Sequence, residues 1–225
     1  DNSVAVAREI LENSGIRYKI VENETNQGCF KQWLNGIHHA EGDIIWIAEA
    51  DDACELDFIE RLLPFFEDDQ VNLAYAQSEV IDENNRHSGF IYTEYTKDLS
   101  EDKWNQDYVN NGEAEIIDGL GIKNTIPNAS GVLMRKSALE GMDEYLKDYA
   151  ISGDWFAYVY AIRVGKIAFC SDVLNYHRRH STSIIYQREQ DVKLFEELLS
   201  IKLYMAENFM IPESIRERFV NHVRN

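Results

Sequence analysis

Residues 42–52 read GDIIWIAEADD, an apolar run followed at once by three acidic side chains. The run from Ile44 to Ala48, which begins after a glycine, predicts a buried strand that carries Glu49, Asp51 and Asp52 to one end of a sheet. Open α/β sheets bind their ligands at that end of their strands. Carboxylates gathered there are suited to a hard divalent cation such as Mg²⁺ or Mn²⁺, which leaves coordination positions for substrate phosphates.

The composition indicates an ordinary globular chain with one sizeable core. Its 225 residues are 44% hydrophobic and 28% charged, with only 3 prolines. The 40 acidic and 22 basic residues give a net charge of -18. This charge argues against nucleic acid or an anionic membrane surface as the main partner, and we expect an anionic ligand to need a metal or a few basic side chains.

The cysteines and the hydropathy indicate an intracellular protein. Cys29, Cys54 and Cys170 are odd in number, far apart and without C-x-x-C spacing. They support neither a disulfide framework nor a structural zinc site, so free thiols are expected. No run reaches the length of a membrane span and no secretory signal opens the chain, so we expect a soluble, cytoplasmic protein.

Hydrophobic periodicity predicts alternating helices and strands in the first half, which is typical of a parallel α/β sheet, and a more mixed order in the second. Helices are expected from residue 4 to Gly15, over 30–39, 55–66, 115–122, 136–145, 154–164 and 187–209, and from Pro212. Strands are expected over 18–21, 44–48, 72–81, 90–92, 130–134, 167–170 and 173–176. In the helix 55–66 the predicted apolar side consists of Leu56, Ile59, Leu62 and Leu63. The polar stretch 93–112 predicts an irregular, flexible or substrate-facing loop.

Four blocks of sequence, taken in order, form a larger pattern. They are Asn26-x-Gly28, Asn35-Gly36-Ile37, Ala40-x-Gly42-Asp43-Ile44 and Glu49-Ala50-Asp51-Asp52; Arg135-Lys136-Ser137-Ala138; Gly153-Asp154-Trp155 with Gly165-Lys166-Ile167-Ala168; and Leu174-x-Tyr176-x-Arg178-x-His180-x-x-Ser183. This pattern resembles the family 2 glycosyltransferases, inverting enzymes of the GT-A fold. The resemblance implies an α/β GT-A-like domain over 1–185, with a mixed, mainly parallel sheet flanked by helices, and a C-terminal helical extension over 186–225.

The resemblance assigns the acidic strand end to donor and metal binding. Glu49, Asp51 and Asp52 stand where the family has its DxD motif, whose last aspartate binds the metal that bridges the diphosphate of a nucleotide-sugar. The implied metal, Mn²⁺ or Mg²⁺, would neutralise charge on the departing diphosphate. The alternative is a helix N-terminus decorated with acidic residues, which is common and favourable.

Asp154 aligns with the family's catalytic base, which takes the proton from the acceptor hydroxyl as that hydroxyl attacks the anomeric carbon. A helix N-cap is the alternative role, and both can hold together. The family usually has Glu-Asp here, whereas this chain has Gly153 before Asp154.

Arg178 and His180 match positions from which the family reaches donor phosphates or the metal, so His180 is counted with Asp51 and Asp52 as a candidate metal ligand. A basic surface loop is the alternative, and a zinc site built on the H-x-x-H of His177 and His180 is disfavoured because no thiol or carboxylate follows at suitable spacing. Lys31 and Asn35 are further candidates for donor contacts near the nucleoside.

For two sets of residues, an explanation without a functional role is the alternative. The aromatic residues can line an acceptor sugar site or simply fill the core; they are Tyr92, Tyr95, Trp104, Tyr108 and Trp155. The glycosylation acceptor patterns that begin at Asn23 and Asn128 are interpreted as chance matches.

The resemblance also concerns the start of the chain. Family members open with a strand, a helix and a second strand that ends in Asp-Asp-x-Ser-x-Asp and forms the nucleoside pocket. Residues 1–3, Asp-Asn-Ser, resemble the end of that segment. We therefore expect an N-terminally truncated form that binds nucleotide-sugar weakly by itself, and exposed sheet edges that favour homo-oligomers.

The resemblance implies a metal-dependent inverting glycosyltransferase of surface polysaccharide synthesis, cytoplasmic or peripheral at the inner face of the plasma membrane. Its expected partners are a nucleotide-sugar, with UDP-sugar favoured, and a carbohydrate or polyprenyl-linked acceptor. One alternative is a non-catalytic GT-A-like module that binds a glycan or a protein. Another is a metal-dependent nucleotidyltransferase, which would give Asp154, Arg178 and His180 no defined role.

Overall fold

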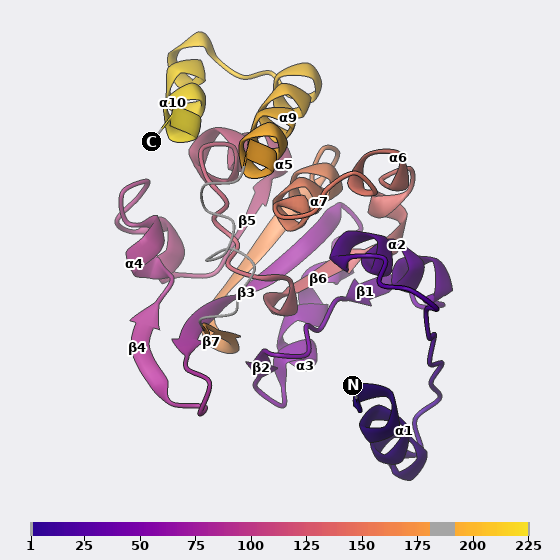
Figure 1. Ribbon diagram of the computed structural model, residues 1–225. Coiled ribbons are helices and arrows are strands. Elements are labelled where there is room, and N and C mark those ends of the chain that lie inside the picture. The colour runs from indigo at the N-terminus through magenta and orange to yellow at the C-terminus, as the bar shows by residue number, and fades with distance from the viewer. Residues whose placement is uncertain (1, 181–191, 225) are drawn as a thin grey trace.

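A seven-stranded mixed sheet forms the centre of the computed structural model, which describes residues 2–180 and 192–224 (Figure 1). Its strands run in the order β1-β6-β3-β7-β2, while β4 pairs with β3 and β5 pairs with β7. The strands are β1 (Ile44–Trp46), β2 (Ala53–Cys54), β3 (Val71–Ile81), β4 (His87–Ile91), β5 (Tyr108–Asn111), β6 (Val132–Arg135) and β7 (Lys166–Arg178). The two long strands, β3 and β7, lie side by side in the middle of the sheet.

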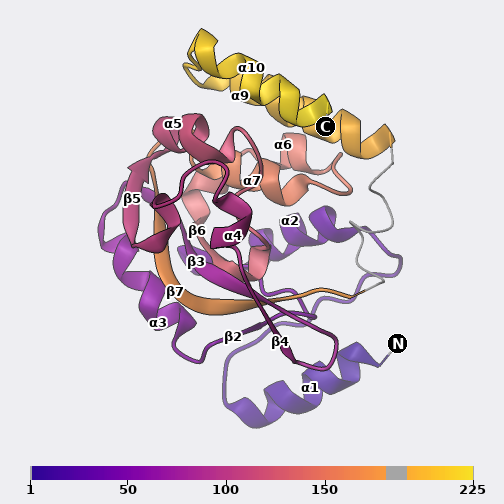
Figure 2. The same ribbon diagram turned by 90° about the vertical axis from the view of Figure 1, so that its left-hand side faces the viewer.

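Helices cover both faces of this sheet (Figures 1 and 2). One face carries α2 (Cys29–His39), α6 (Asp143–Leu146) and α7 (Gly153–Ala161), and the other carries α3 (Phe58–Leu62) with the 3₁₀ turn Leu63–Glu67. Alternate residues of β3 point to opposite faces, so Leu73 and Tyr75 join the first core while Ala74 and Ala76 join the second. The C-terminal helices α9 (Val192–Asn208) and α10 (Glu213–Arg224) lie beyond α7, on its side away from the sheet (Figure 2).

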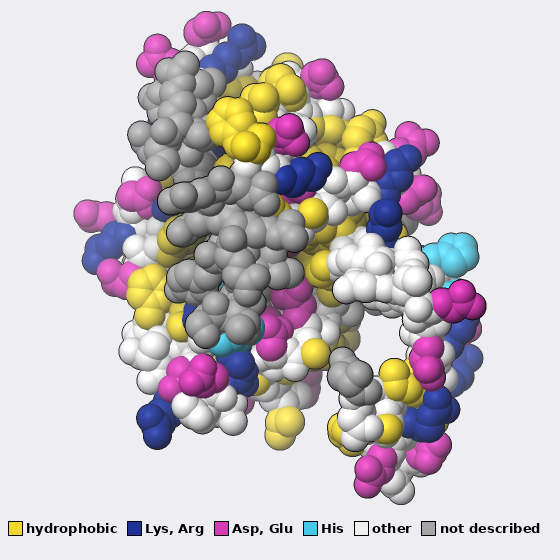
Figure 3. Space-filling model, viewed as in Figure 1, with side chains coloured by type: hydrophobic (Ala, Val, Ile, Leu, Met, Phe, Trp, Pro, Cys, Tyr) yellow, Lys and Arg dark blue, Asp and Glu magenta, His cyan; other side chains and the backbone are white. Residues whose placement is uncertain are grey.

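The first helix, α1 (Ser3–Ser14), stands apart from the rest of the fold. It ends at Gly15, whose φ of 69° lies in the left-handed region that favours glycine, as expected. None of its residues is buried, and in the space-filling view it forms a separate projection (Figure 3). The strand expected over 18–21 is absent, because in the described chain no neighbouring strand supplies hydrogen-bond partners for it.

The mixed sheet is confirmed, but its expected majority of parallel pairs is wrong. In the described residues only β3 and β7 pair in parallel, and the other five pairs are antiparallel. A parallel pair needs a long crossover connection, and β3 and β7 have one. The turn 82–86 joins β3 to β4 directly, which forces an antiparallel pair. Strand β1 lies at the edge of the sheet and only Ile45 is fully buried there, so the expected buried strand is half exposed.

Several local expectations differ from the structure in detail. The stretch 93–112 is ordered into α4 (Thr93–Thr96), a 3₁₀ turn and β5, because β5 finds a partner in β7. The helix expected over 136–145 is broken into the 3₁₀ turn Lys136–Leu139 and α6. The two strands expected over 167–176 are one strand, β7, with a register shift between Cys170 and Val173. Near 115–122 the chain forms α5 (Gly112–Glu115) and a π-helical turn, Ile116–Leu120.

The expected division at 185/186 falls outside the described residues. The structure does show that α9 and α10 share the main core, since Ile201, Met205 and Phe219 pack in the same cluster as α7. No described helix combines the length and the apolar character that a membrane crossing requires.

The buried side of residues 58–66 differs from the predicted one. Leu62 is buried as predicted, but its buried neighbours are Phe58 and Phe66, whereas Leu56 and Ile59 are exposed, because the side that packs on the sheet is formed by residues 58, 62 and 66. Leu62 is fully buried and Leu63 is 43% exposed.

Leu62→Ala is therefore expected to lower the free energy of unfolding by about 2–5 kcal/mol, since it removes buried methyl groups and leaves a cavity. Leu63→Ala is the matched control and is expected to cost less than about 1 kcal/mol. Urea denaturation measures both values. Equal losses for the two variants would contradict this assignment of the buried side.

Candidate functional site

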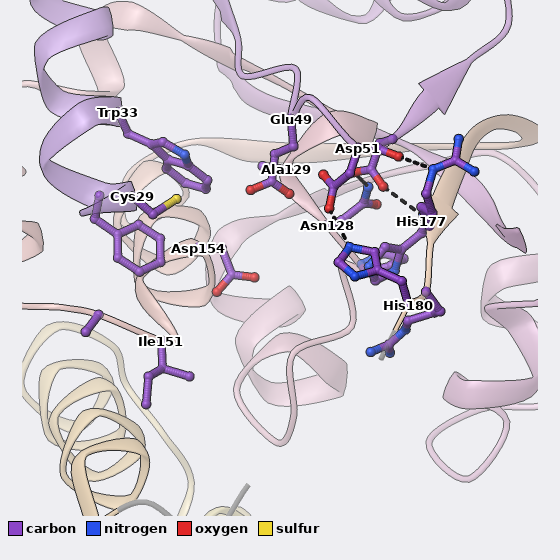
Figure 4. A pocket seen from close by; sticks show the side chains of 16 residues that line it. Cys29, Trp33, Glu49, Asp51, Asn128, Ala129, Ile151, Asp154, His177 and His180 are labelled. Carbon is purple, nitrogen blue, oxygen red and sulfur yellow. Dashed lines mark hydrogen bonds and ion pairs between the residues drawn. The ribbon is translucent and has the colours of Figure 1, made fainter. Parts of the chain in front are cut away.

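A pocket of about 250 Å³ opens where the loop after β1 meets the end of β7 and the first turn of α7 (Figure 4). Six of the predicted site residues line it: Glu49, Asp51, Asp52, Asp154, Arg178 and His180. Phe30 and Trp33 of α2 form an apolar wall. The structure thus brings together side chains from four separate segments of the sequence.

Lys31 and Asn35 are not brought to this pocket. Both lie on α2, where Lys31 is exposed and Asn35 lines a different hollow together with Lys19. Trp33 and Phe30, from the same helix, face the pocket in their place.

Asp52 is held by hydrogen bonds on both of its carboxylate oxygens. Its Oδ2 accepts from the Nδ2 of Asn128 and from the Oγ of Ser130 at 2.7 Å, and its Oδ1 accepts from the backbone N–H of Arg178 at 2.9 Å. Asn175, fully buried in β7, donates in turn to the Oδ1 of Asn128 at 2.7 Å. Asp52 therefore joins the loop after β1 to the segment that precedes β6 and to the end of β7.

Asn128 and Ser130 were not predicted as site residues. Their only sequence signal is the glycosylation pattern, which does not indicate a contact with Asp52. Asn128 is buried and its amide is fully engaged in this hydrogen-bond network, which agrees with the interpretation of that pattern as a chance match.

Asp51 and His180 form the second polar group of the pocket. The Oδ2 of Asp51 lies 3.1 Å from the Nε2 of His180, and the Asp51 side chain is 52% exposed. The guanidinium of Arg178 donates to the backbone carbonyls of Asp51 and Asp82, which ties the end of β7 to the acidic loop.

A divalent cation fits the pair Asp51 and His180 better than it fits Asp52. The pair offers one carboxylate and one imidazole, both suitable ligands for Mn²⁺, on a side that is open to a ligand. Both oxygens of Asp52 already accept hydrogen bonds. Within the described chain, no group of three or more His, Cys, Asp and Glu side chains is arranged to hold a metal by itself.

Asp154 lies in the first turn of α7 and points into the pocket (Figure 4). The N-cap of this helix is Ser152, so the N-cap role considered for Asp154 is wrong, although its charge does favour the helix N-terminus. Its Oδ2 accepts a hydrogen bond from the Nδ2 of Asn124 at 3.2 Å. Burial is the main cause that raises the pKa of Asp154 to about 6.

Nearby groups are also shifted toward their neutral forms. Burial, followed by the charges of Asp52, Asp154 and Asp51, raises the pKa of Glu49 to about 8. Burial, followed by the charges of Glu49, Asp154 and Asp51, raises the pKa of the Cys29 thiol to about 11. Burial lowers the pKa of His177 to about 4, and its Nδ1 lies 2.7 Å from the Tyr92 hydroxyl. The pocket therefore concentrates acidic groups that a bound cation would help to ionise.

Most of the aromatic residues that were considered for an acceptor site belong to the core. Trp104 and Trp155 are buried and donate their indole N–H groups to the Tyr75 hydroxyl and the Leu120 carbonyl, each at 2.8 Å. Tyr95, which is 39% exposed, remains the candidate for a sugar-facing ring.

Comparison with known proteins shows the family of this chain and solved structures with a similar fold. The family model described as glycosyl transferase family 2 matches residues 1–141. S. aureus TarS 1-349 superposes with a TM-score of 0.68 at 15% identity, over 99% of this chain and 58% of that chain. The same fragment in complex with UDP-GlcNAc gives 0.64 at 15% identity, over 99% and 60%, and in complex with UDP 0.64 at 13%, over 100% and 58%. This chain thus spans about three fifths of the solved fragments, and no curated protein sequence matches it.

The hydrogen bonds of Asp52 predict a stability difference between two adjacent aspartates. Asp52→Asn is expected to lower the free energy of unfolding by about 2–3 kcal/mol in the presence of EDTA, because an amide nitrogen would face donor groups. Asp51→Asn is the control, since Asp51 is half exposed, and a change below about 1 kcal/mol is expected. Chemical denaturation of both variants tests this, and a larger loss for Asp51→Asn would contradict it.

The raised pKa of Asp154 predicts that the variant Asp154→Asn is more stable than the wild type, by an amount that depends on pH. Its pKa is raised from 3.8 to about 6 by folding, so the folded state binds the proton more tightly and loses stability as pH rises through this interval. Asp154→Asn removes that cost, so its free energy of unfolding relative to the wild type should rise by up to about 3 kcal/mol between pH 4 and pH 7.

Thermal and urea denaturation at the two pH values measure this difference. Asp148→Asn, at an exposed position, controls for the loss of one carboxylate. A difference that does not change with pH would show that Asp154 carries no such cost.

Proposed function

Because this chain belongs to glycosyl transferase family 2, we propose that its pocket transfers a sugar from a nucleoside-diphosphate donor to an acceptor hydroxyl with inversion at the anomeric carbon. The observation that carries the proposal is the position of Asp154, which faces the same pocket as Asp51 and His180. A single displacement needs a base for the acceptor hydroxyl and a group that binds the donor phosphates, and both must lie in the same pocket.

In this mechanism Asp154 acts as the base. The acceptor oxygen forms a bond to the anomeric carbon while the bond from that carbon to the diphosphate breaks, and the hydroxyl proton passes to the Asp154 carboxylate. The electron pair of the broken bond leaves with the nucleoside diphosphate. A raised pKa of about 6 suits the base, because the carboxylate is ionised at neutral pH and still holds a proton better than an exposed aspartate does.

Asp51 and His180 would hold Mn²⁺ or Mg²⁺ beside the donor diphosphate. The chemistry that such a cation supplies is neutralisation of the charge that develops on the leaving group. Asp52 then acts through its hydrogen bonds by fixing the acidic loop, and Arg178 ties that loop to β7. Glu49 and Asp51 line the same pocket, which supports the proposal that Glu49 contacts the donor.

The donor class is supported by the TarS fragment, whose structures hold UDP-GlcNAc and UDP. We infer a UDP-sugar donor and a glycan or polyprenyl-linked acceptor of surface polysaccharide synthesis for this chain. We propose Tyr95, whose ring is 39% exposed and lies beside that of Tyr92, as the residue that packs against an acceptor sugar.

Donor hydrolysis and transfer by the intact protein test the function. With UDP-sugars and Mn²⁺, Asp154→Asn is expected to lower kcat about 10²–10⁴-fold, and EDTA should remove activity. The wild-type kcat/KM should fall as pH drops through about 6, since the base becomes protonated there.

Asp148→Asn serves again as the control and should retain wild-type rates. Equal hydrolysis by the wild type and Asp154→Asn would exclude Asp154 as the base. Binding of a glycan without any turnover would favour the non-catalytic module instead.

A further inference from the structure

Helix α9 carries two charged side chains that are almost completely buried. Glu197 is 3% exposed and Lys202 is 8% exposed. Burying a charge is costly unless hydrogen bonds replace the lost water. Helix α9 lies against α7 (Figure 2). Both side chains make hydrogen bonds to backbone groups of the main body of the protein.

Glu197 binds the backbone that leads into α7. Its Oε1 accepts from the N–H of Ala150 at 2.7 Å, and its Oε2 accepts from the N–H groups of Ile151 and Ser152 at 3.0 and 2.8 Å. The side chain of Ser152 makes no capping hydrogen bond, so Glu197 supplies an anion to this helix N-terminus from a distant part of the chain. Asp154 follows two residues later.

Lys202 binds the segment on the other side of Asp154. Its Nζ donates to the carbonyls of Gly121 and Ile122 at 2.6 and 2.8 Å and lies 4.7 Å from the centre of the Trp155 ring. Asn124, two residues after Ile122, donates to Asp154. Burial lowers the pKa of Lys202 to about 7, because an ammonium group loses its hydration here.

We propose that Glu197 and Lys202 are positioning residues that hold Asp154 at the pocket, which makes α9 a part of the transfer site. Each fixes one of the two segments that place Asp154, namely 150–152 and 121–124. The family match ends at residue 141, so neither residue belongs to it. This inference rests on the proposed role of Asp154 as the base.

Two acidic side chains act on Asp154, Glu49 from the loop after β1 and Glu197 from α9. The Cys29 thiol of α2 and the Tyr158 hydroxyl of α7 are the other titratable groups that interact with it, and the neutral amide of Asn124 donates a hydrogen bond to it. Removing the charge of Glu197 is therefore expected to lower the pKa of Asp154.

The experiment compares Glu197→Gln with Glu196→Gln, an exposed neighbour on the same helix, in the intact protein. Glu197→Gln is expected to lower kcat about 10–100-fold with the donor KM within twofold, since the base is displaced while donor contacts remain. The acid limb of its kcat/KM profile should move to lower pH. Glu196→Gln should match the wild type in all three quantities.

Circular dichroism shows whether a variant has lost activity because it is unfolded. A second pair of variants tests the positioning role independently. Lys202→Met keeps the apolar stem without the donors and should lower kcat at unchanged donor KM. Glu197→Asp keeps the charge on a shorter side chain and should lower kcat without moving the acid limb.

The outcomes separate the two proposals. If Asp154→Asn is inactive while folded Glu197→Gln and Lys202→Met keep the wild-type kcat and pH profile, the positioning role is overturned and the proposed function stands. If Asp154→Asn is fully active, the proposed function fails. Loss of kcat in both α9 variants with an unchanged donor KM supports the positioning role.

Discussion

The hydrogen bonds of Asp52 are the constraint on which the pocket depends. One carboxylate accepts from Asn128, Ser130 and the backbone of Arg178, which lie 76 to 126 residues further along the chain. These contacts fix the acidic loop after β1 against the segment before β6 and the end of β7. Asp51 can point outward toward His180 because the adjacent Asp52 is turned inward. An aspartate within a predicted metal motif thus acts here as the structural anchor of that motif.

The same pocket is electrostatically costly. Four carboxylates and a thiol share a partly buried space in a protein of net charge -18, and folding shifts Glu49, Cys29 and Asp154 toward their neutral forms. Such a cluster lowers stability at neutral pH but suits a site that receives a cation and a negatively charged diphosphate. The amide groups of Asn124 and Asn128 satisfy the carboxylates without neutralising them. Arg178 and Arg179 are the basic residues in the lining of this pocket.

The C-terminal helices contact the two segments that flank Asp154. Buried Glu197 and Lys202 bind backbone groups on both sides of Asp154, so α9 braces α7 through polar contacts as well as through the shared apolar core. Backbone N–H and carbonyl groups at the ends of short helical segments need such partners when they are buried. Glu197 and Lys202 thereby satisfy backbone groups that lie on both sides of Asp154.

Local sequence determined the elements whose periodicity is strong and the chemistry of the site. The spacing of α2 and α7, the strand before Glu49 and the order of the motif blocks predicted the mixed α/β fold and the gathering of Glu49, Asp51, Asp52, Asp154, Arg178 and His180. Tertiary structure decided the antiparallel pairing, the buried side of residues 58–66 and the strand β5, because each depends on the neighbouring element that the chain meets. It also decided that Asp52 faces inward, that Lys31 and Asn35 lie away from the pocket, and that Glu197 and Lys202 approach Asp154. The reason is physical: hydrophobic periodicity is a property of adjacent residues, whereas hydrogen bonds and pKa shifts arise between groups that only folding brings together.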